Sequence, residues 1–191
     1  MPFNLPIALT WLRVAAIPLL VAIFYLPSQW LTPFEKNLIA ALIFTLAAVT
    51  DWLDGFLARR LKQESAFGQF LDPVADKLIV AAALLVLLNM DRVQVWVALI
   101  IIGREITISA LREWMALLGA GKSVAVHMVG KLKTTAQLIA IPFLLLNDTL
   151  FGWLDCARFG TWLIWIASFL TLWSMFYYLK KALPQLVGKV D

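Results

Sequence analysis

Charged residues are scarce in this sequence of 191 residues: only 15% of them are charged, whereas 62% are hydrophobic. Soluble domains are usually about a quarter charged and about half apolar. A soluble protein of this length could not cover so much apolar surface with so few polar side chains. The composition therefore excludes soluble, disordered and collagen-like proteins, and it predicts that the lipid bilayer is the solvent of this chain.

Cysteine and histidine are also nearly absent. Cys156 is the only cysteine, so no disulfide can form within the chain. A catalytic thiol needs an activating neighbour, but the only histidine, His127, is far away in the sequence and lies in an expected loop. The net charge is +4, but the basic residues are spread among apolar runs and form no basic face. We therefore expect no thiol chemistry and no nucleic-acid partner.

Long apolar runs are what the sequence does contain. A helix that spans a membrane needs roughly 20 apolar residues, and breaker residues divide this chain into six such runs. The expected spans are residues 5–26, 38–59, 73–88, 93–115, 131–146 and 153–179. The sequence thus predicts an all-α integral membrane protein, a bundle of six transmembrane helices that forms a single domain over residues 1–191.

The positions of the basic residues predict the orientation of this bundle. Six spans put both chain ends on one side of the membrane. Of the sixteen Lys and Arg residues, only Lys36, Arg92 and Arg158 fall on the opposite side. Because cytoplasmic connections carry an excess of Lys and Arg, we expect both termini to be cytoplasmic. The connections after the second and fourth spans should be cytoplasmic as well.

Two pairs of aspartates interrupt the apolar pattern on the expected cytoplasmic side. Asp51 and Asp54 lie three residues apart near the end of the second span. Asp72 and Asp76 lie four residues apart, and Pro73, which suits the first turn of a helix, predicts that the third span begins near Asp72. Each pair shares one helix face. Since the short connection makes these helices antiparallel neighbours, we expect the two pairs to meet at one depth.

Carboxylates at this depth need compensating charge. A charged residue at a helix centre costs roughly 2.5 to 3.5 kcal/mol on insertion scales, and neighbouring carboxylates also repel one another. Hard oxygen ligands suit Mg²⁺, Mn²⁺ or Ca²⁺. Carboxylates from two facing helices could hold two such ions about 3.5 to 4 Å apart, the arrangement used for phosphoryl chemistry. The alternative is a set of structural ion pairs with Arg59, Arg60, Lys62 and Lys77.

The stretches that carry these aspartates, "DWLDGFLARR" and "GQFLDPVADK", resemble the signature of the CDP-alcohol phosphotransferases. The stretches "FNLPIALTWLRV", "REITISALREWMA" and "GKLKTTAQ" extend the resemblance as far as about Pro142. Members of this family are membrane enzymes with a core of six helices, and they displace CMP from a CDP-linked lipid or alcohol with an acceptor hydroxyl. The resemblance therefore implies a transferase whose active site lies at the cytoplasmic face.

The resemblance also implies roles for single residues. Asp51, Asp54 and Asp72 are expected to be metal ligands for two Mg²⁺ ions, with Mn²⁺ as an alternative, and Asp51 and Asp72 are expected to bridge the ions. Asp76 is expected to bind the second ion and to act as general base on the acceptor hydroxyl. The residues expected to bind the CDP-diacylglycerol substrate are Gly55, Arg59, Ser65 and Gly68. Asn4, Thr10 and Arg13 are further candidates for contacts with the nucleotide.

The acceptor that we expect, glycerol 3-phosphate, needs a site for its phosphate. Arg112 lies at the cytoplasmic end of the fourth span, and Lys131 and Lys133 begin the fifth. We expect these three residues to bind that phosphate, although anchoring at the membrane surface would also explain the lysines. Arg104 is next to Glu105 in the sequence, so a buried ion pair is as good an explanation for it as a substrate contact.

The expected reaction transfers the phosphatidyl group of CDP-diacylglycerol to glycerol 3-phosphate, giving phosphatidylglycerophosphate and CMP. The expected location is a bacterial inner (cytoplasmic) membrane, with membrane lipids and a second copy of the chain as further partners. An alternative is the same chemistry with inositol phosphate, serine or a phospholipid as acceptor. An intramembrane prenyltransferase would need more spans. A divalent-cation transporter would need a polar path across the bilayer, but the outer halves of these spans are nearly free of charge.

Overall fold

The computed structural model describes residues 5–61, 66–117 and 128–187, and the side chains of 8–51, 68, 70–117 and 132–180. The described chain forms six helices and one short hairpin. The helices are α1 (Leu5–Tyr25), α2 (Pro33–Leu61), α3 (Ala66–Asn89), α4 (Val95–Leu117), α5 (Met128–Leu146) and α6 (Cys156–Val187). The strands β1 (Thr149–Leu150) and β2 (Leu154–Asp155) pair antiparallel between α5 and α6. The six helices confirm the all-α prediction.

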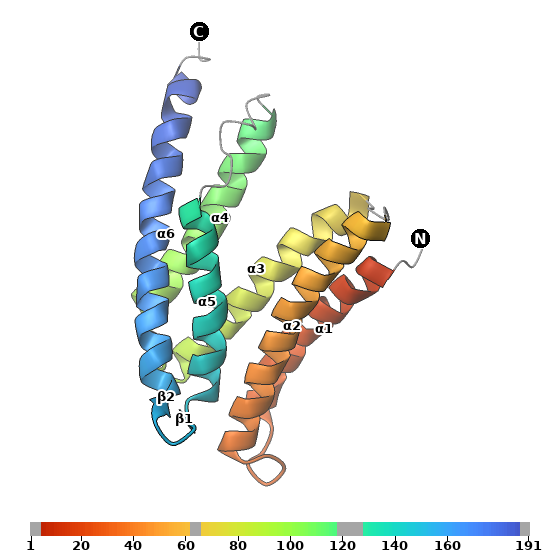
Figure 1. Ribbon diagram of the computed structural model, residues 1–191, viewed down its shortest axis with the longest axis vertical. Coiled ribbons are helices and arrows are strands. Elements are labelled where there is room, and N and C mark those ends of the chain that lie inside the picture. Colours follow the sequence, from red (N-terminus) through yellow and green to blue (C-terminus); the bar gives the residue numbers. More distant parts are fainter. Residues whose placement is uncertain (1–4, 62–65, 118–127, 188–191) are drawn as a thin grey trace.

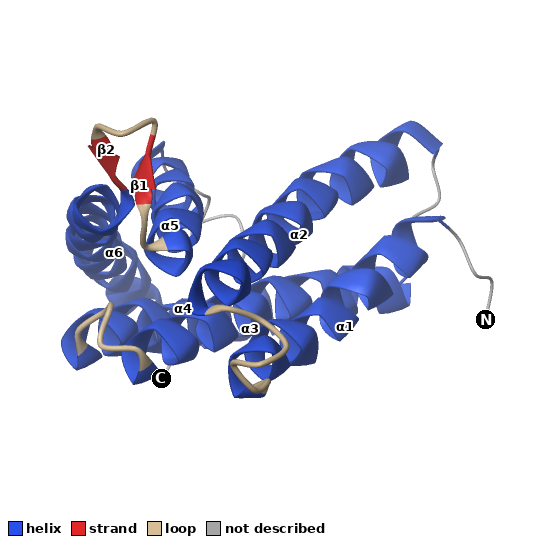
Figure 2. Cartoon of the chain, turned by 90° about the horizontal axis from the view of Figure 1, so that it is seen from below, coloured by secondary structure: helices blue, strands red, loops and turns tan. Residues whose placement is uncertain are grey.

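Two groups of three helices build the molecule (Figure 1). Helices α1, α2 and α3 form one group, and α4, α5 and α6 form the other. The groups meet toward the end that holds the hairpin and diverge toward the end that holds both chain termini. The core lies where they meet and includes Leu20, Phe44, Leu84, Ile101 and Leu144, each at most 1% exposed. Figure 2 shows the hairpin beside the ends of α5 and α6.

Helix α2 begins earlier than the apolar pattern predicts, at Pro33 and not at residue 38. The hydroxyl and the backbone N–H of Thr32 both donate to a Glu35 carboxylate oxygen over 2.8 Å, and the backbone N–H of Glu35 donates back to the Thr32 hydroxyl. These bonds form a capping box, and Pro33 occupies the first helical position that proline favours. The cap therefore starts the helix at Pro33, although this turn is more polar than the apolar run that follows.

The predicted start of the third helix is wrong. Helix α3 begins at Ala66, so Pro73 lies inside it and Asp72 is in the second turn of the helix. An internal proline removes one backbone hydrogen bond. Packing offsets this loss, because Ala75 and Ile79, just after Pro73, are buried against neighbouring helices. The connection between α2 and α3 is therefore only residues 62–65.

The predicted start of the last helix is also wrong, by three residues. Helix α6 begins at Cys156 and not at residue 153, because the hairpin takes up the preceding residues. Phe151 and Gly152 have positive φ values of 56° and 74°, which reverse the chain between the strands. Asp155 then caps the helix by accepting a hydrogen bond of 3.1 Å from the backbone N–H of Arg158. A turn and a cap therefore replace the predicted helical turn.

The outward surface is apolar, as a bilayer requires. Exposed side chains on α2 and α6 include Leu42, Leu46, Phe169 and Trp173. Within the described residues, three segments are long and apolar enough to cross a membrane: Ala8–Tyr25, Pro33–Asp51 and Cys156–Lys180. The chain is therefore an integral membrane protein, and the count of six spans stays a prediction. Helices α3, α4 and α5 carry more charge than a plain lipid-facing span.

Arg92 joins three parts of the chain at the hairpin end. Its Nη1 donates to the carbonyl oxygens of Leu144 and Leu145, over 3.2 and 2.7 Å, and its Nη2 donates to Oδ1 of Asn37 over 3.0 Å. The last carbonyls of a helix have no partner within the helix. Arg92 therefore caps α5 and ties it to α2 and to the connection between α3 and α4.

We expect Arg92→Ala to destabilise the protein by about 1.5 to 3 kcal/mol, because hydrogen bonds from a charged donor are lost at buried carbonyls. Thermal unfolding of the purified protein in detergent measures this loss. Arg158→Ala is the matched control at the same end, because the Arg158 side chain is 86% exposed and its ion pair with Asp155 lies at the surface. Equal melting temperatures for the two variants would contradict the role of Arg92.

Candidate active site

A cavity of about 500 Å³ lies between the two groups of helices. All six helices contribute to its lining. Asp51 lies in the second half of α2, Arg112 near the end of α4 and Lys133 near the start of α5. These positions put the cavity toward the end of the bundle that holds both termini (Figure 1). The charged and aromatic lining residues are Arg13, Phe44, Asp51, Asp76, Lys77, Arg104, Glu105, Arg112, Lys133 and Tyr178.

One side of the cavity carries two carboxylates, Asp51 on α2 and Asp76 on α3, which we call the acidic wall. Both contact the same nitrogen, Nη1 of Arg13 on α1, with Asp51 Oδ1 at 3.1 Å. Arg13 is only 1% exposed, whereas the side chains of Asp51 and Asp76 are 46% and 40% exposed. One aspartate of each predicted pair, Asp51 on α2 and Asp76 on α3, therefore meets the other, and both remain open to the cavity.

Small residues surround the acidic wall. Ala47 and Ala48 line the cavity one helical turn before Asp51. Because they fill little space beside the carboxylate, a bulky charged group can approach the helix closely at this point.

Asp72 and Gly68 are the other predicted site residues on α3. Asp72 accepts a hydrogen bond from the Thr10 hydroxyl of α1, and Gly68 lies in the first turn of α3. Neither is among the described residues that line the cavity. Asp72 is one helical turn from Asp76, so it lies at the edge of the acidic wall and is held toward α1.

Several predicted site residues fall outside the described side chains. Asp54, Gly55 and Arg59 belong to the last turns of α2, and Lys131 belongs to the first turn of α5, but only their backbone is described. Ser65 lies in the segment 62–65, which is outside the described residues altogether. The roles expected for these five residues stay predictions.

The described part of the acidic wall fits a divalent cation by its chemistry. Asp51 and Asp76 turn carboxylate oxygens toward one shared cationic group, and carboxylate oxygens are the ligands that Mg²⁺ prefers. Among the described side chains, no three acidic, histidine or cysteine residues are grouped to hold a metal by themselves. Arg13 balances the carboxylates here, whereas Lys77 makes no ion pair within the described residues. That Asp51 and Asp76 belong to a set of metal ligands stays a prediction.

The opposite side of the cavity is basic, and its residues Arg104, Glu105, Arg112 and Lys133 are called the basic wall. Lys133 Nζ lies 3.0 Å from Glu105 Oε1, and Arg104 Nη1 contacts the same oxygen. Arg104 and Lys133 are 6% and 2% exposed. Three cations against one carboxylate give this wall a net charge of +2. Within the described residues Arg104 Nε is buried without a hydrogen-bond partner, so the wall is suited to an anion.

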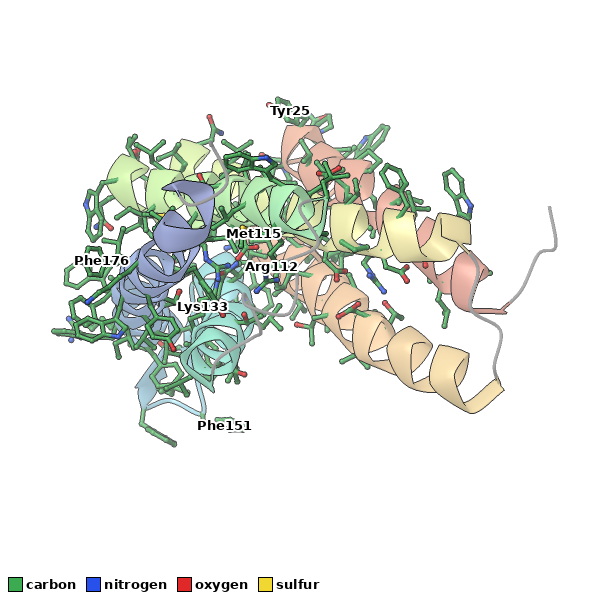
Figure 3. All side chains as sticks on the ribbon, turned by 90° about the horizontal axis from the view of Figure 1, so that it is seen from above. Tyr25, Arg112, Met115, Lys133, Phe151 and Phe176 are labelled. Atoms are coloured by element: carbon green, nitrogen blue, oxygen red, sulfur yellow. The ribbon has the colours of Figure 1, made fainter. Side chains whose placement is uncertain are left out.

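Arg112 differs from the other two cations because it meets a ring and not a carboxylate. Its guanidinium carbon lies 5.7 Å from the centre of the Tyr178 ring on α6. Tyr178 is 1% exposed and also lines the cavity. Figure 3, which looks onto this end, labels Arg112 and Lys133 on their two helices. Arg112 and Lys133 are thus brought to one cavity, as predicted for the acceptor site.

Three features of the site are missed by sequence reasoning. Arg13 was assigned only to the nucleotide, although a single charge inside an apolar span is a signal for a buried partner. Tyr178 gives no distinct signal in the sequence, because it lies in the run "WSMFYYLKK", where six of the nine positions are apolar or aromatic. The pairing of Lys133 with Glu105 depends on how α4 and α5 approach each other, which spacing within one helix does not reveal.

Known proteins match this chain over almost its whole length. The pattern of the CDP-alcohol phosphatidyltransferase family covers residues 3–173. Similar proteins from Escherichia coli (strain K12) and Shigella sonnei (strain Ss046) are 52% identical to it, and one from Salmonella choleraesuis (strain SC-B67) is 50% identical. Each match covers 99% of this chain and 100% of the relative. All three are named CDP-diacylglycerol–glycerol-3-phosphate 3-phosphatidyltransferase. The chain therefore belongs to the CDP-alcohol phosphatidyltransferase family.

Proposed function

We propose that this protein transfers the phosphatidyl group of CDP-diacylglycerol to glycerol 3-phosphate, releasing CMP and forming phosphatidylglycerophosphate. The observation that carries the proposal is a single cavity in which an acidic wall faces a basic wall. Such a cavity can take two anionic substrates at once, one through cations held by carboxylates and one through fixed cations. The names of the full-length relatives support the same reaction and the same acceptor.

The acidic wall serves the CDP-lipid in this proposal. Asp51, Asp54, Asp72 and Asp76 would hold two Mg²⁺ ions, or Mn²⁺ in their place. When bound, these ions supply charge neutralisation for the pyrophosphate and for the departing CMP. Gly55, Arg59, Ser65 and Gly68 would contact the CDP moiety. A glycine admits close approach of the substrate, and an arginine can bind a phosphate through two parallel hydrogen bonds.

The basic wall serves the acceptor phosphate. Lys133 and Arg104 already share Glu105, whereas Arg112 is exposed and makes no ion pair within the described residues. Arg112 is therefore the cation most available to an incoming phosphate. Lys133 and Lys131, both on the first turns of α5, would complete the phosphate site.

Asp76 is the proposed general base. Its carboxylate is 40% exposed and lines the same cavity as Arg112, so an acceptor held by Arg112 can direct its hydroxyl toward it. Asp76 would take the hydroxyl proton while the hydroxyl oxygen bonds to the β-phosphorus of CDP-diacylglycerol. The bond from that phosphorus to the CMP oxygen breaks, and CMP leaves with the bonding electrons.

The proposed location is a bacterial inner membrane with the cavity at the cytoplasmic face. The distribution of Lys and Arg supports this orientation, because the basic side is the side of both termini. Glycerol 3-phosphate is soluble, and the headgroup of the CDP-lipid lies at the membrane surface, so both can reach a site at this depth. A homodimer stays a prediction of the family resemblance.

An acceptor screen tests the proposed function directly. Purified protein is supplied with CDP-diacylglycerol and, in separate reactions, with glycerol 3-phosphate, serine, inositol phosphate or a phospholipid. We expect CMP release and a new lipid product only with glycerol 3-phosphate, because the full-length relatives are named for this acceptor and the basic wall is suited to its phosphate. Transfer to one of the other acceptors, and none to glycerol 3-phosphate, would refute the assignment.

The acidic wall makes activity depend on divalent metal. We expect a chelator to abolish CMP release, and added Mg²⁺ or Mn²⁺ to restore it, because carboxylates alone repel the pyrophosphate. Asp51→Asn should lose activity and bind Mn²⁺ more weakly, as measured by electron paramagnetic resonance. Asp91→Asn, at the opposite end of α3, is the matched control and should keep both properties. Activity that survives exhaustive chelation would remove the basis of this prediction.

The basic wall makes the affinity for the acceptor depend on Arg112. A hydrogen bond between charged groups contributes about 1.5 to 3 kcal/mol, so Arg112→Ala should raise KM for glycerol 3-phosphate about tenfold to a hundredfold. KM for CDP-diacylglycerol should stay unchanged, because the acidic wall is intact. Glu113→Gln, at the next residue, is the control and should change neither constant. If Arg112→Ala only reduces the amount of folded protein, the residue is an anchor and not a phosphate ligand.

A further inference from the structure

We propose that Tyr178 of α6 is a positioning residue for the acceptor: its ring holds the guanidinium of Arg112 at the cavity wall without neutralising it. The inference rests on the proposed function, because it takes Arg112 as a ligand of the acceptor phosphate. It assigns a role in specificity to the last helix, which carries no part of the family signature in this sequence.

The geometry is that of a cation over a ring. The guanidinium carbon of Arg112 lies 5.7 Å from the ring centre of Tyr178, within the range of about 6 Å in which the ring face attracts a cation. Both residues line the cavity. When the flat face of a guanidinium lies against a ring, the N–H groups at the edge of the guanidinium stay available to a phosphate.

Tyr178 is held firmly enough to act as a platform. It is 1% exposed and packs in a cluster with Ile108, Leu111 and Met115, three buried residues of α4. Tyr177 meets its ring edge-on, with ring centres 6.1 Å apart. Arg112 by contrast has an exposed side chain with many rotamers. A fixed ring that restricts those rotamers reduces the entropy lost when the phosphate binds.

The affinity for the acceptor depends on whether the partner of Arg112 is a ring or a carboxylate. Glu105 holds Arg104 and Lys133 through ion pairs with its carboxylate. A carboxylate beside Arg112 would likewise hold it, but it would compete with the acceptor phosphate for the same N–H groups. The ring positions Arg112 and leaves its full charge for the substrate. Tyr178 therefore acts on acceptor affinity through Arg112 and is not itself required to touch the acceptor.

The test replaces Tyr178 by Phe, which keeps the ring, and by Leu, which keeps apolar volume but has no ring face. A cation–ring contact corresponds to a change of about two- to thirtyfold in affinity. We expect Tyr178→Leu to raise KM for glycerol 3-phosphate within that range, with kcat and KM for CDP-diacylglycerol changed less than about twofold. Tyr178→Phe should behave like the wild type.

A double-mutant cycle separates positioning from general packing. In the Arg112→Ala background, Tyr178→Leu should cause no further rise in KM for glycerol 3-phosphate, because the contact is already gone. A merely structural tyrosine would lower the melting temperature and raise both KM values in either background. Equal effects of Tyr178→Leu with and without Arg112 would overturn the proposal.

A graded series covers the case in which the leucine variant does not fold. Phenylalanines with one to four ring fluorines at position 178 keep the shape of the ring while they weaken the attraction of its face for a cation. We expect KM for glycerol 3-phosphate to rise stepwise along the series at a constant melting temperature. A KM that is independent of fluorination would overturn the proposal.

Binding of inorganic phosphate distinguishes a failure of this inference from a failure of the proposed function. If the wild type does not transfer to glycerol 3-phosphate, the proposed function fails, and the affinity for inorganic phosphate, measured by calorimetry on the metal-loaded protein, still tests Tyr178. We expect the fluorinated series and Tyr178→Leu to bind inorganic phosphate about two- to thirtyfold more weakly than Tyr178→Phe. Equal phosphate affinities throughout would refute the positioning role even if the transferase assay succeeds.

Discussion

A buried guanidinium between two carboxylates joins the first three helices at the depth of the cavity. Arg13 of α1 contacts Asp51 of α2 and Asp76 of α3 through one nitrogen, and it is almost fully buried. An arginine at this depth would be costly without partners, and so would the carboxylates without a cation. The three helices must therefore pack in the register that brings these groups together. The position of the acidic wall follows from that requirement.

The rest of the cavity depends on the separation of the acidic wall from the basic wall. The carboxylates of the acidic wall come from α2 and α3, while the cations of the basic wall come from α4 and α5. The two groups of helices diverge at this end (Figure 1), and the walls face each other across the cavity. Within the described residues no ion pair joins one wall to the other. Glu105 holds two of the basic side chains in place. The remaining cation, Arg112, is left for a ligand.

Much of this arrangement can be predicted from the sequence, and the reason is geometric. Spacings of three and four residues place aspartates on one helix face, and a short connection forces the two faces to meet, so the encounter of Asp51 with Asp76 is predictable. The start of α3 is not, because burial of Ala75 and Ile79 outweighs the local preference of Pro73. Tyr178 is not predictable either, since aromatic residues lie on several sides of α6 and do not show which face meets α4. Spacing along the sequence determines which residues share a helix face. Contacts between helices that are far apart in the sequence depend on the fold.

The central claim is that cations on the acidic wall and the acceptor phosphate on the basic wall occupy one cavity. The ³¹P relaxation rate of glycerol 3-phosphate, measured with the purified protein loaded with Mn²⁺, tests this most directly. The account predicts strong paramagnetic relaxation of the phosphate, which excess Mg²⁺ reverses and Arg112→Ala removes. A relaxation rate no greater than that caused by free Mn²⁺, or one unaffected by the Arg112 substitution, would contradict it.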